Sequence, residues 1–417
     1  MERSKNYLKI FFLTVFLFQI VIFFFNWFVD PYDLFGSFSI EGLNKLKPES
    51  TSRSRMTKAW AVYKRKPNGV IMGSSRAEMG LSPEHPGWEI DNVFNLALTG
   101  PNMFEVLRYF QHVHSLRPQK KVVLGLDFFM FNVYRENRPG YDDSRLFVDI
   151  EGKLNSRWSQ IEKYSSLVSI DALSSSVNTV MNQNGDQLFS SSFLDNGQVD
   201  WSNMRQVIRH TGGYRRMFFK SEEDFINDQW FVPPYKEYSF IHKISGESSF
   251  TYFQDFLVIA YRDNVDLQIF ISPSHARLWE ALSIVGLWST FEQWKRELVQ
   301  INEKIAMEHK KKAFPLWDFS GYNSITNEEV PLIDDFETEM KWYWDTSHYN
   351  KSAGDLVLDR IFNYQNPTHT VPSDFGVLLT KTNIEEHLKN VQIAQKNYRK
   401  THVNDWAEMK KAARNKR

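Results

Sequence analysis

The chain has 417 residues, of which 42% are hydrophobic and 15% aromatic, so it can bury the core of one large domain or of two modest ones. Its 50 basic and 50 acidic residues give a formal net charge of zero, which predicts no nucleic-acid partner. There is no cysteine, and this excludes disulfides, thiol nucleophiles and thiolate metal sites.

The first thirty residues predict a membrane anchor. Residues 1–9 contain three basic side chains, and residues 10–29 form a nearly unbroken apolar run rich in phenylalanine. About twenty apolar residues in a helix match the hydrocarbon thickness of a bilayer, and a basic flank favours the cytoplasmic side. The run is too long for a typical signal peptide, no small-x-small cleavage site follows it, and the lack of a polar stripe argues against a buried core helix. We therefore expect a cytoplasmic segment at 1–9, an uncleaved signal-anchor at 10–29 that passes once through the inner (cytoplasmic) membrane, and a body on the periplasmic or extracytoplasmic side.

The next segment, residues 30–66, is expected to be a juxtamembrane connector. It opens with a DPY turn and continues as a polar stretch. The stretch is basic, with Arg53, Arg55 and Lys58 among its charged residues.

From residue 67 onward, short apolar runs alternate with helical patterns. The five runs that we interpret as buried strands begin GVIMGSSR, NVFNLALTG, KVVLGLDFFMF, DLQIFISPSH and AFPLWDFSG. Between them lie amphipathic patterns such as PNMFEVLRYFQHVHSL. This alternation predicts an α/β fold over residues 67–366, with a mostly parallel sheet covered by helices on both faces. In such sheets the active residues follow the carboxyl ends of the strands.

Two segments depart from the alternation. Residues 140–250 are polar and rich in serine, asparagine and glutamine, with helical patches, so we expect a helical insertion and a candidate lid. Residues 367–417 form a basic C-terminal tail, for which we expect a solvated helix; a helix resting on the membrane or on a partner is the alternative. In this tail, four apolar residues share helical spacing: Ile384, Leu388, Val391 and Ala394.

Three short motifs fall next to predicted element ends. Gly73-Ser74-Ser75-Arg76 follows the first strand, Asn95-Leu96-Ala97-Leu98-Thr99-Gly100 ends the second, and Asp345-Thr346-Ser347-His348 precedes the last helical pattern, AGDLVLDRIF. A serine after a strand can expose its hydroxyl at the top of the sheet, beside free backbone N–H groups. Each motif alone is common, but their order is informative.

Taken together, G-x-S, N-L-x-x-x-G and D-x-x-H resemble the motif blocks of the SGNH (GDSL-like) hydrolase superfamily, over residues 70–135 and 250–365. The resemblance implies a flavodoxin-like three-layer α/β/α fold. It also implies a nucleophile at Ser75, a general base at His348, and an acid at Asp345 that supports the imidazolium.

The same resemblance implies an oxyanion hole formed by the backbone N–H groups of Ser75 and Gly100. The third block of the superfamily usually reads G-x-N-D, whereas this chain has Gly125-Leu126-Asp127-Phe128. An ionised Asp127 would repel an oxyanion, so we expect it to pair with Arg76 or bind substrate. Backbone donors would then form the hole, with Asn102 or Asn132 as candidate additional donors.

Other histidines are weaker candidates. His275, in Ser274-His275 after a predicted strand, has no acid in the local pattern of the triad, so we expect a substrate-contacting or structural role. His112 and His114 are two residues apart on a predicted helix and face different ways, which disfavours a metal pair. We expect neither a metal nor a cofactor.

A single anchor joined to an SGNH-like body resembles the membrane-tethered O-acyltransferase proteins of bacterial envelope modification, including the alginate O-acetylation proteins and the D-alanine transfer protein of teichoic acid synthesis. The resemblance implies that an acyl group, expected to be acetyl, moves through acyl-Ser75 to a cell-envelope or extracellular polysaccharide. It further implies a polytopic membrane-bound O-acyltransferase as the donor partner. The alternatives are a carbohydrate or lipid esterase and a non-catalytic binding or assembly protein; the membrane tether favours transfer.

Overall fold

A six-stranded sheet forms the centre of the computed structural model, which describes residues 2–149, 151–155, 157–183 and 193–414. The strand order is β2-β1-β3-β4-β5-β6. The first five strands pair in parallel, and β6 pairs antiparallel with β5. The longest register joins β3 and β4, from Lys121 opposite Asp266 to Leu126 opposite Ile271. The strands are β1 (Gly69–Met72), β2 (Val93–Asn95), β3 (Lys121–Leu126), β4 (Asp266–Ile271), β5 (Leu316–Asp318) and β6 (Val377–Leu378).

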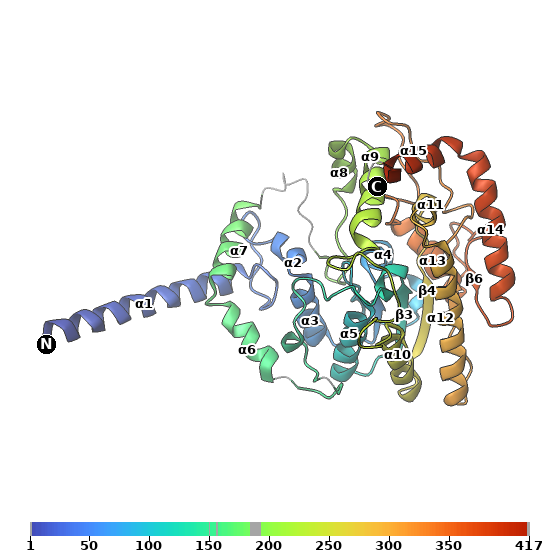
Figure 1. Cartoon of the computed structure of the whole chain (residues 1–417). Coiled ribbons are helices and arrows are strands. Elements are labelled where there is room, and N and C mark those ends of the chain that lie inside the picture. The colour runs from blue at the N-terminus through green and yellow to red at the C-terminus, as the bar shows by residue number, and fades with distance from the viewer. Residues whose placement is uncertain (1, 150, 156, 184–192, 415–417) are drawn as a thin grey trace.

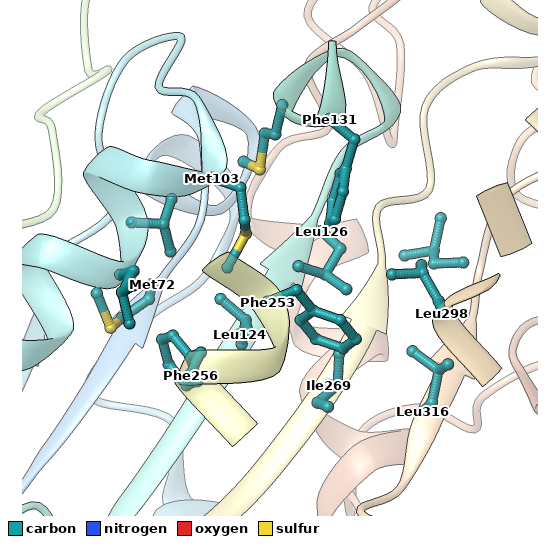
Figure 2. Packing of buried hydrophobic residues seen from close by; sticks show 14 of the residues in the cluster. Met72, Met103, Leu124, Leu126, Phe131, Phe253, Phe256, Ile269, Leu298 and Leu316 are labelled. Carbon is teal, nitrogen blue, oxygen red and sulfur yellow. The ribbon is translucent and has the colours of Figure 1, made fainter. Parts of the chain in front are cut away.

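Both faces of the sheet are buried, which explains why its strands read as continuous apolar runs. On one face, side chains such as Met72, Leu124 and Ile269 pack against helices that include Phe253 and Leu298 (Figure 2). The helices of this face are α3 (Ser54–Arg65), α5 (Met103–Leu116), α10 (Phe250–Arg262) and α12 (Trp288–Glu308). The opposite face is covered by α4 (Ser75–Gly80) and α13 (Lys351–Phe362). The expectation of a mostly parallel α/β sheet between helices is therefore confirmed.

Residues 30–66 belong to the body, so the expected connector is wrong for most of its length. After α2 (Pro48–Ser52), helix α3 packs against α5. Two basic residues of this segment are buried in ion pairs: Arg55 with Glu105 at 2.6 Å and Lys58 with Glu78 at 2.8 Å. These partners lie 50 and 20 residues further along the chain, so the sequence pattern alone could not reveal them.

Helix α1 (Glu2–Val29) extends away from the body (Figure 1). Its span Arg3–Val29 is long and apolar enough to cross a membrane. This agrees with the expected single anchor, and the helix begins earlier than the apolar run because its basic residues are helical as well.

The expected insertion is helical, but its two halves lie in different places. Helices α6 (Arg157–Ser166) and α7 (Ile170–Met181) lie at the base of α1 (Figure 1). Helices α8 (Met204–Thr211) and α9 (Tyr214–Asp224), followed by a π-helical turn, η4 (Phe225–Gln229), lie beside α4 and α11 (Ala276–Ile284). Only the second half therefore approaches the carboxyl ends of the strands.

The C-terminal tail is packed, not solvated. Helix α14 (Ile384–Thr401) lies along α12, and α15 (Val403–Arg414) lies against α11. Its basic residues also have partners in the body, as when Arg399 pairs with Glu280 at 2.7 Å. Five apolar side chains of these helices are buried: Ile384, Leu388, Val391, Tyr398 and Met409. The helical spacing seen in the sequence is thus a core-facing stripe.

Candidate active site

The turn after β1 separates two adjacent serines. Gly73 has φ +143°, and a side chain there would collide with the backbone of Gly125, so the turn requires glycine. Ser74 caps α4 by accepting a hydrogen bond from the N–H of Arg76 and is fully buried. Ser75 is the first residue of α4 and is only half-buried. The turn therefore directs Ser75, not Ser74, toward open space.

A chain of hydrogen bonds joins Ser75 to the D-x-x-H motif. The distance from Ser75 Oγ to His348 Nε2 is 2.9 Å, and the distance from His348 Nδ1 to Asp345 Oδ2 is 2.7 Å. If Nδ1 carries the proton, it donates to the carboxylate and leaves Nε2 free to accept from the hydroxyl. The structure thus brings together the three residues that the sequence predicted as a group, although Ser75 stands 270 positions before Asp345 and 273 before His348.

Asp345 is held in place by further donors. Its Oδ1 accepts hydrogen bonds from the N–H groups of Ser347 at 2.7 Å and His348 at 3.0 Å, and from the Ser221 hydroxyl at 3.2 Å. Burial alone would raise the pKa of Asp345, but the charge and hydrogen bond of His348, with the two backbone donors, lower it below its ordinary value. The carboxylate is therefore ionised at neutral pH and fixes the orientation of the imidazole.

Ser75, Asp345 and His348 line a cavity of about 350 Å³. One wall comes from the ends of β1 and β2, and the facing wall comes from the second half of the insertion. The insertion residues in that wall are Trp201, Met204, Met217, Lys220, Ser221, Asp224, Phe225 and Gln229. We call them the roof. Methionine and aromatic side chains make much of it apolar.

The roof also carries charge. Lys220 and Asp224, one turn apart on α9, both line the cavity. Burial raises the pKa of Asp224 most strongly, Lys220 opposes the rise, and the carboxylates of Asp228 and Asp345 add to it. No local pattern in the sequence marks the roof residues, because they reach the cavity only through the fold.

Two backbone N–H groups are available at the cavity. Gly100 lines it, with φ +58°, and the N–H groups of Ser75 and Gly100 donate to no acceptor in the part of the chain that the structure describes. Asn102 does not line this cavity: it caps α5 and donates to the Arg135 carbonyl at 2.9 Å. Asn132 is likewise occupied, donating to the Trp230 carbonyl at 3.0 Å. The expectation of a side-chain donor at Asn102 or Asn132 is therefore wrong.

Asp127 is turned away from the cavity. Both its carboxylate oxygens are occupied, one by Arg76 Nη1 at 2.5 Å and the other by the Ser74 hydroxyl at 2.5 Å. Arg76 is itself buried, and its Nε donates to Ser347 Oγ at 3.0 Å. Of the two expectations for Asp127, pairing with Arg76 is confirmed, and neither residue lines the cavity. The pair instead connects the Ser75 turn to the His348 loop.

His275 does not contact the cavity, so a substrate contact is wrong and the structural alternative holds. It caps α11, accepting at Nδ1 from the N–H of Arg277, while Nε2 lies 2.7 Å from the Glu328 carbonyl. Burial lowers the pKa of His275 to about 3, so the ring is neutral. Among the described residues, no group of three or more histidine or carboxylate side chains is arranged to hold a metal ion.

In comparisons with known proteins, no family model and no curated protein matches this sequence.

Proposed function

We propose that this protein is a membrane-anchored serine acyltransferase that moves an acyl group, expected to be acetyl, onto a cell-envelope or extracellular polysaccharide through an acyl-Ser75 intermediate. The observation that carries the proposal is the hydrogen-bonded series Ser75, His348 and Asp345 on the wall of a partly apolar cavity. A nucleophile, a base and an orienting acid in this order are what acyl transfer requires.

In the first half-reaction, Ser75 Oγ attacks the acyl carbonyl while His348 Nε2 takes the hydroxyl proton. Asp345 stabilises the imidazolium that forms. The N–H groups of Ser75 and Gly100 are the donors available to the oxyanion. Collapse of the tetrahedral intermediate returns the proton from His348 to the leaving group and leaves the acyl-serine ester.

In the second half-reaction, a sugar hydroxyl gives its proton to His348 and attacks the acyl-serine carbonyl. Collapse of the tetrahedral intermediate breaks the bond from the acyl carbon to Ser75 Oγ, and His348 returns the proton to Ser75 as the acylated sugar leaves. Water at the same position would make the protein an esterase, which is the alternative. The apolar side chains of the roof, such as Met204, Met217 and Phe225, favour transfer because they restrict water. A membrane tether also suits a donor that is delivered at the membrane.

The architecture supports the resemblance to SGNH hydrolases. The order β2-β1-β3-β4-β5 is that of flavodoxin-like doubly wound sheets, in which ligands bind at the carboxyl ends of the strands. Ser75 follows β1 at that edge. The chain differs from the third motif block of the superfamily at Asp127, which stands where an asparagine donor is usual. Asp127 is a buried partner of Arg76 and not a donor to the cavity.

The proposed location follows from α1. Basic residues before the span favour a cytoplasmic N-terminus, so the cavity would lie on the periplasmic or extracytoplasmic side. The proposed partners there are a polytopic membrane-bound O-acyltransferase as acyl donor and a polysaccharide as acceptor.

The test is intact-protein mass spectrometry after brief exposure of the detergent-solubilised full chain to an activated acetyl ester. We expect one acetyl adduct on the wild type and none on Ser75→Ala or His348→Ala. Ser324→Ala is the matched control, because Ser324 is exposed and does not line the cavity. An adduct that persists in Ser75→Ala, or a folded wild type that forms none, would overturn the proposal.

A second step separates transfer from hydrolysis. The acetylated protein is mixed with envelope oligosaccharides or with buffer alone, and loss of the adduct is followed. Faster loss with an acetylated oligosaccharide as product supports transfer, whereas equal loss in buffer identifies an esterase.

A further inference from the structure

Helix α7 turns small and polar side chains toward the protein and exposes three of its large apolar side chains. The buried face carries small or polar side chains: Ala172, Ser175, Ser176 and Thr179. The outward face carries Ile170, Val177 and Met181, spaced seven and four residues apart, with the short polar side chains of Ser174 and Asn178 between them. Ile170 and Met181 are 80% and 74% exposed. A helix on a water-facing surface shows the opposite arrangement, with its apolar stripe toward the core.

The buried polar face binds the end of α1. Ser176 Oγ donates to Asn26 Oδ1 at 2.8 Å, and Asn26 Nδ2 donates to the Leu167 carbonyl at 2.9 Å. Ser175 Oγ accepts from the Tyr32 hydroxyl just beyond the helix, at 2.9 Å. Asn26 is 1% exposed, so this polar residue within the apolar run is satisfied entirely by the α6–α7 segment.

The position of this contact fixes the level of α7 relative to a bilayer. A helix rises 1.5 Å per residue, so Asn26 lies only about 5 Å before the end of α1 at Val29. That is where the span leaves the hydrocarbon if residues 10–29 cross it. Helices α6 and α7 extend from the base of α1 on opposite sides, across its direction (Figure 1). They would therefore run along the membrane plane.

Neighbouring segments near the end of α1 expose further apolar side chains. In α6 and the turn after it, Ile161, Tyr164 and Val168 are exposed. Phe38 is exposed in a loop that Asn44 fastens to the end of α1, by donating to the carbonyls of Phe28 and Phe38. Charge is scarce on α7: its single charged residue, Asp171, pairs with Arg53 at 3.3 Å.

We propose that the outward face of α7, with the exposed apolar side chains of α6 and Phe38, lies in the lipid headgroup region of the bilayer that α1 spans. The occupant is lipid because the helix that carries this face is hydrogen-bonded, through Ser176 and Asn26, to the last turns of the span. The body is then held at a fixed orientation on the membrane instead of swinging on a tether. The inference rests on α1 crossing a bilayer and is independent of the acyl-transfer chemistry.

The absence of cysteine makes the test direct. Single cysteines are introduced by Ile170→Cys or Met181→Cys, labelled with a nitroxide, and the full chain is reconstituted in phospholipid vesicles at a low protein-to-lipid ratio. The matched controls are Ile244→Cys and Met307→Cys, whose native side chains are 87% and 74% exposed elsewhere on the body. Collision of each label with oxygen, which enters lipid, and with a water-soluble nickel chelate is measured by electron paramagnetic resonance.

We expect the ratio of oxygen to nickel collisions to be several-fold higher at positions 170 and 181 than at 244 and 307. Nickel access at 170 and 181 equal to that at the controls would overturn the proposal. A third result would also overturn the proposal: few collisions with either reagent at first, and more collisions with both once the protein is diluted with lipid. A second copy of the chain would then be what covers this face. The labels sit at opposite ends of α7, so local disturbance by one leaves the other as an independent test.

Discussion

Ser74 and Ser75 are chemically identical neighbours that the fold uses in different ways. Ser74 is buried and completes the hydrogen bonding of Asp127, whereas Ser75 reaches the cavity and His348. The difference arises because Ser74 is the N-cap and Ser75 the first helical residue, and successive residues of a helix point about 100° apart. A residue's role therefore depends on which partner its side chain reaches. Asp127 is a second example, because its carboxylate binds Arg76 and Ser74 and does not reach the cavity.

Replacing Asp127 by asparagine tests whether this carboxylate is structural. Asp127→Asn leaves the buried Arg76 guanidinium without its counter-charge, so the free energy of unfolding should fall by about 3–5 kcal/mol. Folded Asp127→Asn should still form the acetyl adduct on Ser75, because Asp127 does not line the cavity. Chemical denaturation and mass spectrometry measure the two effects.

The control for this change is Asp334→Asn. Asp334 forms an exposed ion pair with Arg216 at 3.9 Å, so this variant should change stability by no more than about 0.5 kcal/mol. A stable Asp127→Asn protein with faster adduct formation would contradict the structural role and point to a carboxylate that opposes the oxyanion.

At the scale of elements, the relative position of α4 and α13 sets the geometry of the site. Ser75 begins α4, and His348 lies three residues before α13. The two helices meet at Gly80 and Gly354, where a methyl group on Gly354 would overlap the carbonyl oxygen of Gly80. This close approach requires glycine, and it holds the nucleophile at the start of α4 near the base in the loop before α13.

Adding that methyl group should move the two helices apart. Gly354→Ala is expected to lower the free energy of unfolding by about 3 kcal/mol or more, because the clash is with backbone and cannot be relieved by a rotamer change. Acetyl-adduct formation should slow as well, since the distance from Ser75 Oγ to His348 Nε2 depends on this contact. Thermal unfolding and adduct kinetics are the measurements.

Gly246→Ala is the control, because a methyl group there meets no atom within 4 Å and only the positive φ of +74° adds a cost, about 1 kcal/mol. Adduct kinetics in Gly354→Ala that match those of Gly246→Ala would mean that the helix contact does not position the site.

The sequence predicted those elements whose signals are local. The five parallel strands are short apolar runs, and Asp345 and His348 stand three positions apart, so both are visible in a single window. The two-residue strand β6 and the roof residue Ser221 cannot be identified from a local window. Long-range contacts bring β6 to the sheet and Ser221 to Asp345. The helical spacing predicts the apolar stripe in α14, but nothing in that spacing identifies the surface that covers the stripe.

At the scale of the whole molecule, the C-terminal helix supports the roof of the cavity. Arg277 of α11 pairs with Glu222 of α9 at 2.7 Å and with Asp405 of α15 at 2.9 Å. Arg215 of α9 also pairs with Asp405, at 3.0 Å. Helix α9 carries Ser221, which donates to Asp345, so a continuous set of contacts runs from α15 to the candidate triad.

Neutralising Asp405 should loosen the roof. Burial raises the pKa of Asp405, but Arg277 and Arg215 lower it more, to below its ordinary value. A carboxyl whose pKa is lower in the folded state stabilises the fold above its ordinary pKa, so the contribution is complete at neutral pH and is lost as the pH falls through the lowered pKa. Asp405→Asn should therefore cost about 3 kcal/mol at pH 7, with much less difference from wild type in strong acid.

Hydrogen exchange separates loosening of the roof from a general loss of stability. In Asp405→Asn, the amides of α9 should exchange faster than in the wild type, while those of α5 on the opposite face change only with global unfolding. Glu385→Gln is the control, since it removes an exposed ion pair between α14 and Arg296 that contributes at most about 1 kcal/mol. If α9 and α5 respond equally, the C-terminal helix stabilises the whole body and has no particular relation to the cavity. If α9 responds alone and acetyl-adduct formation slows with it, the last helix of the chain helps to position Asp345 through Arg277 and Ser221.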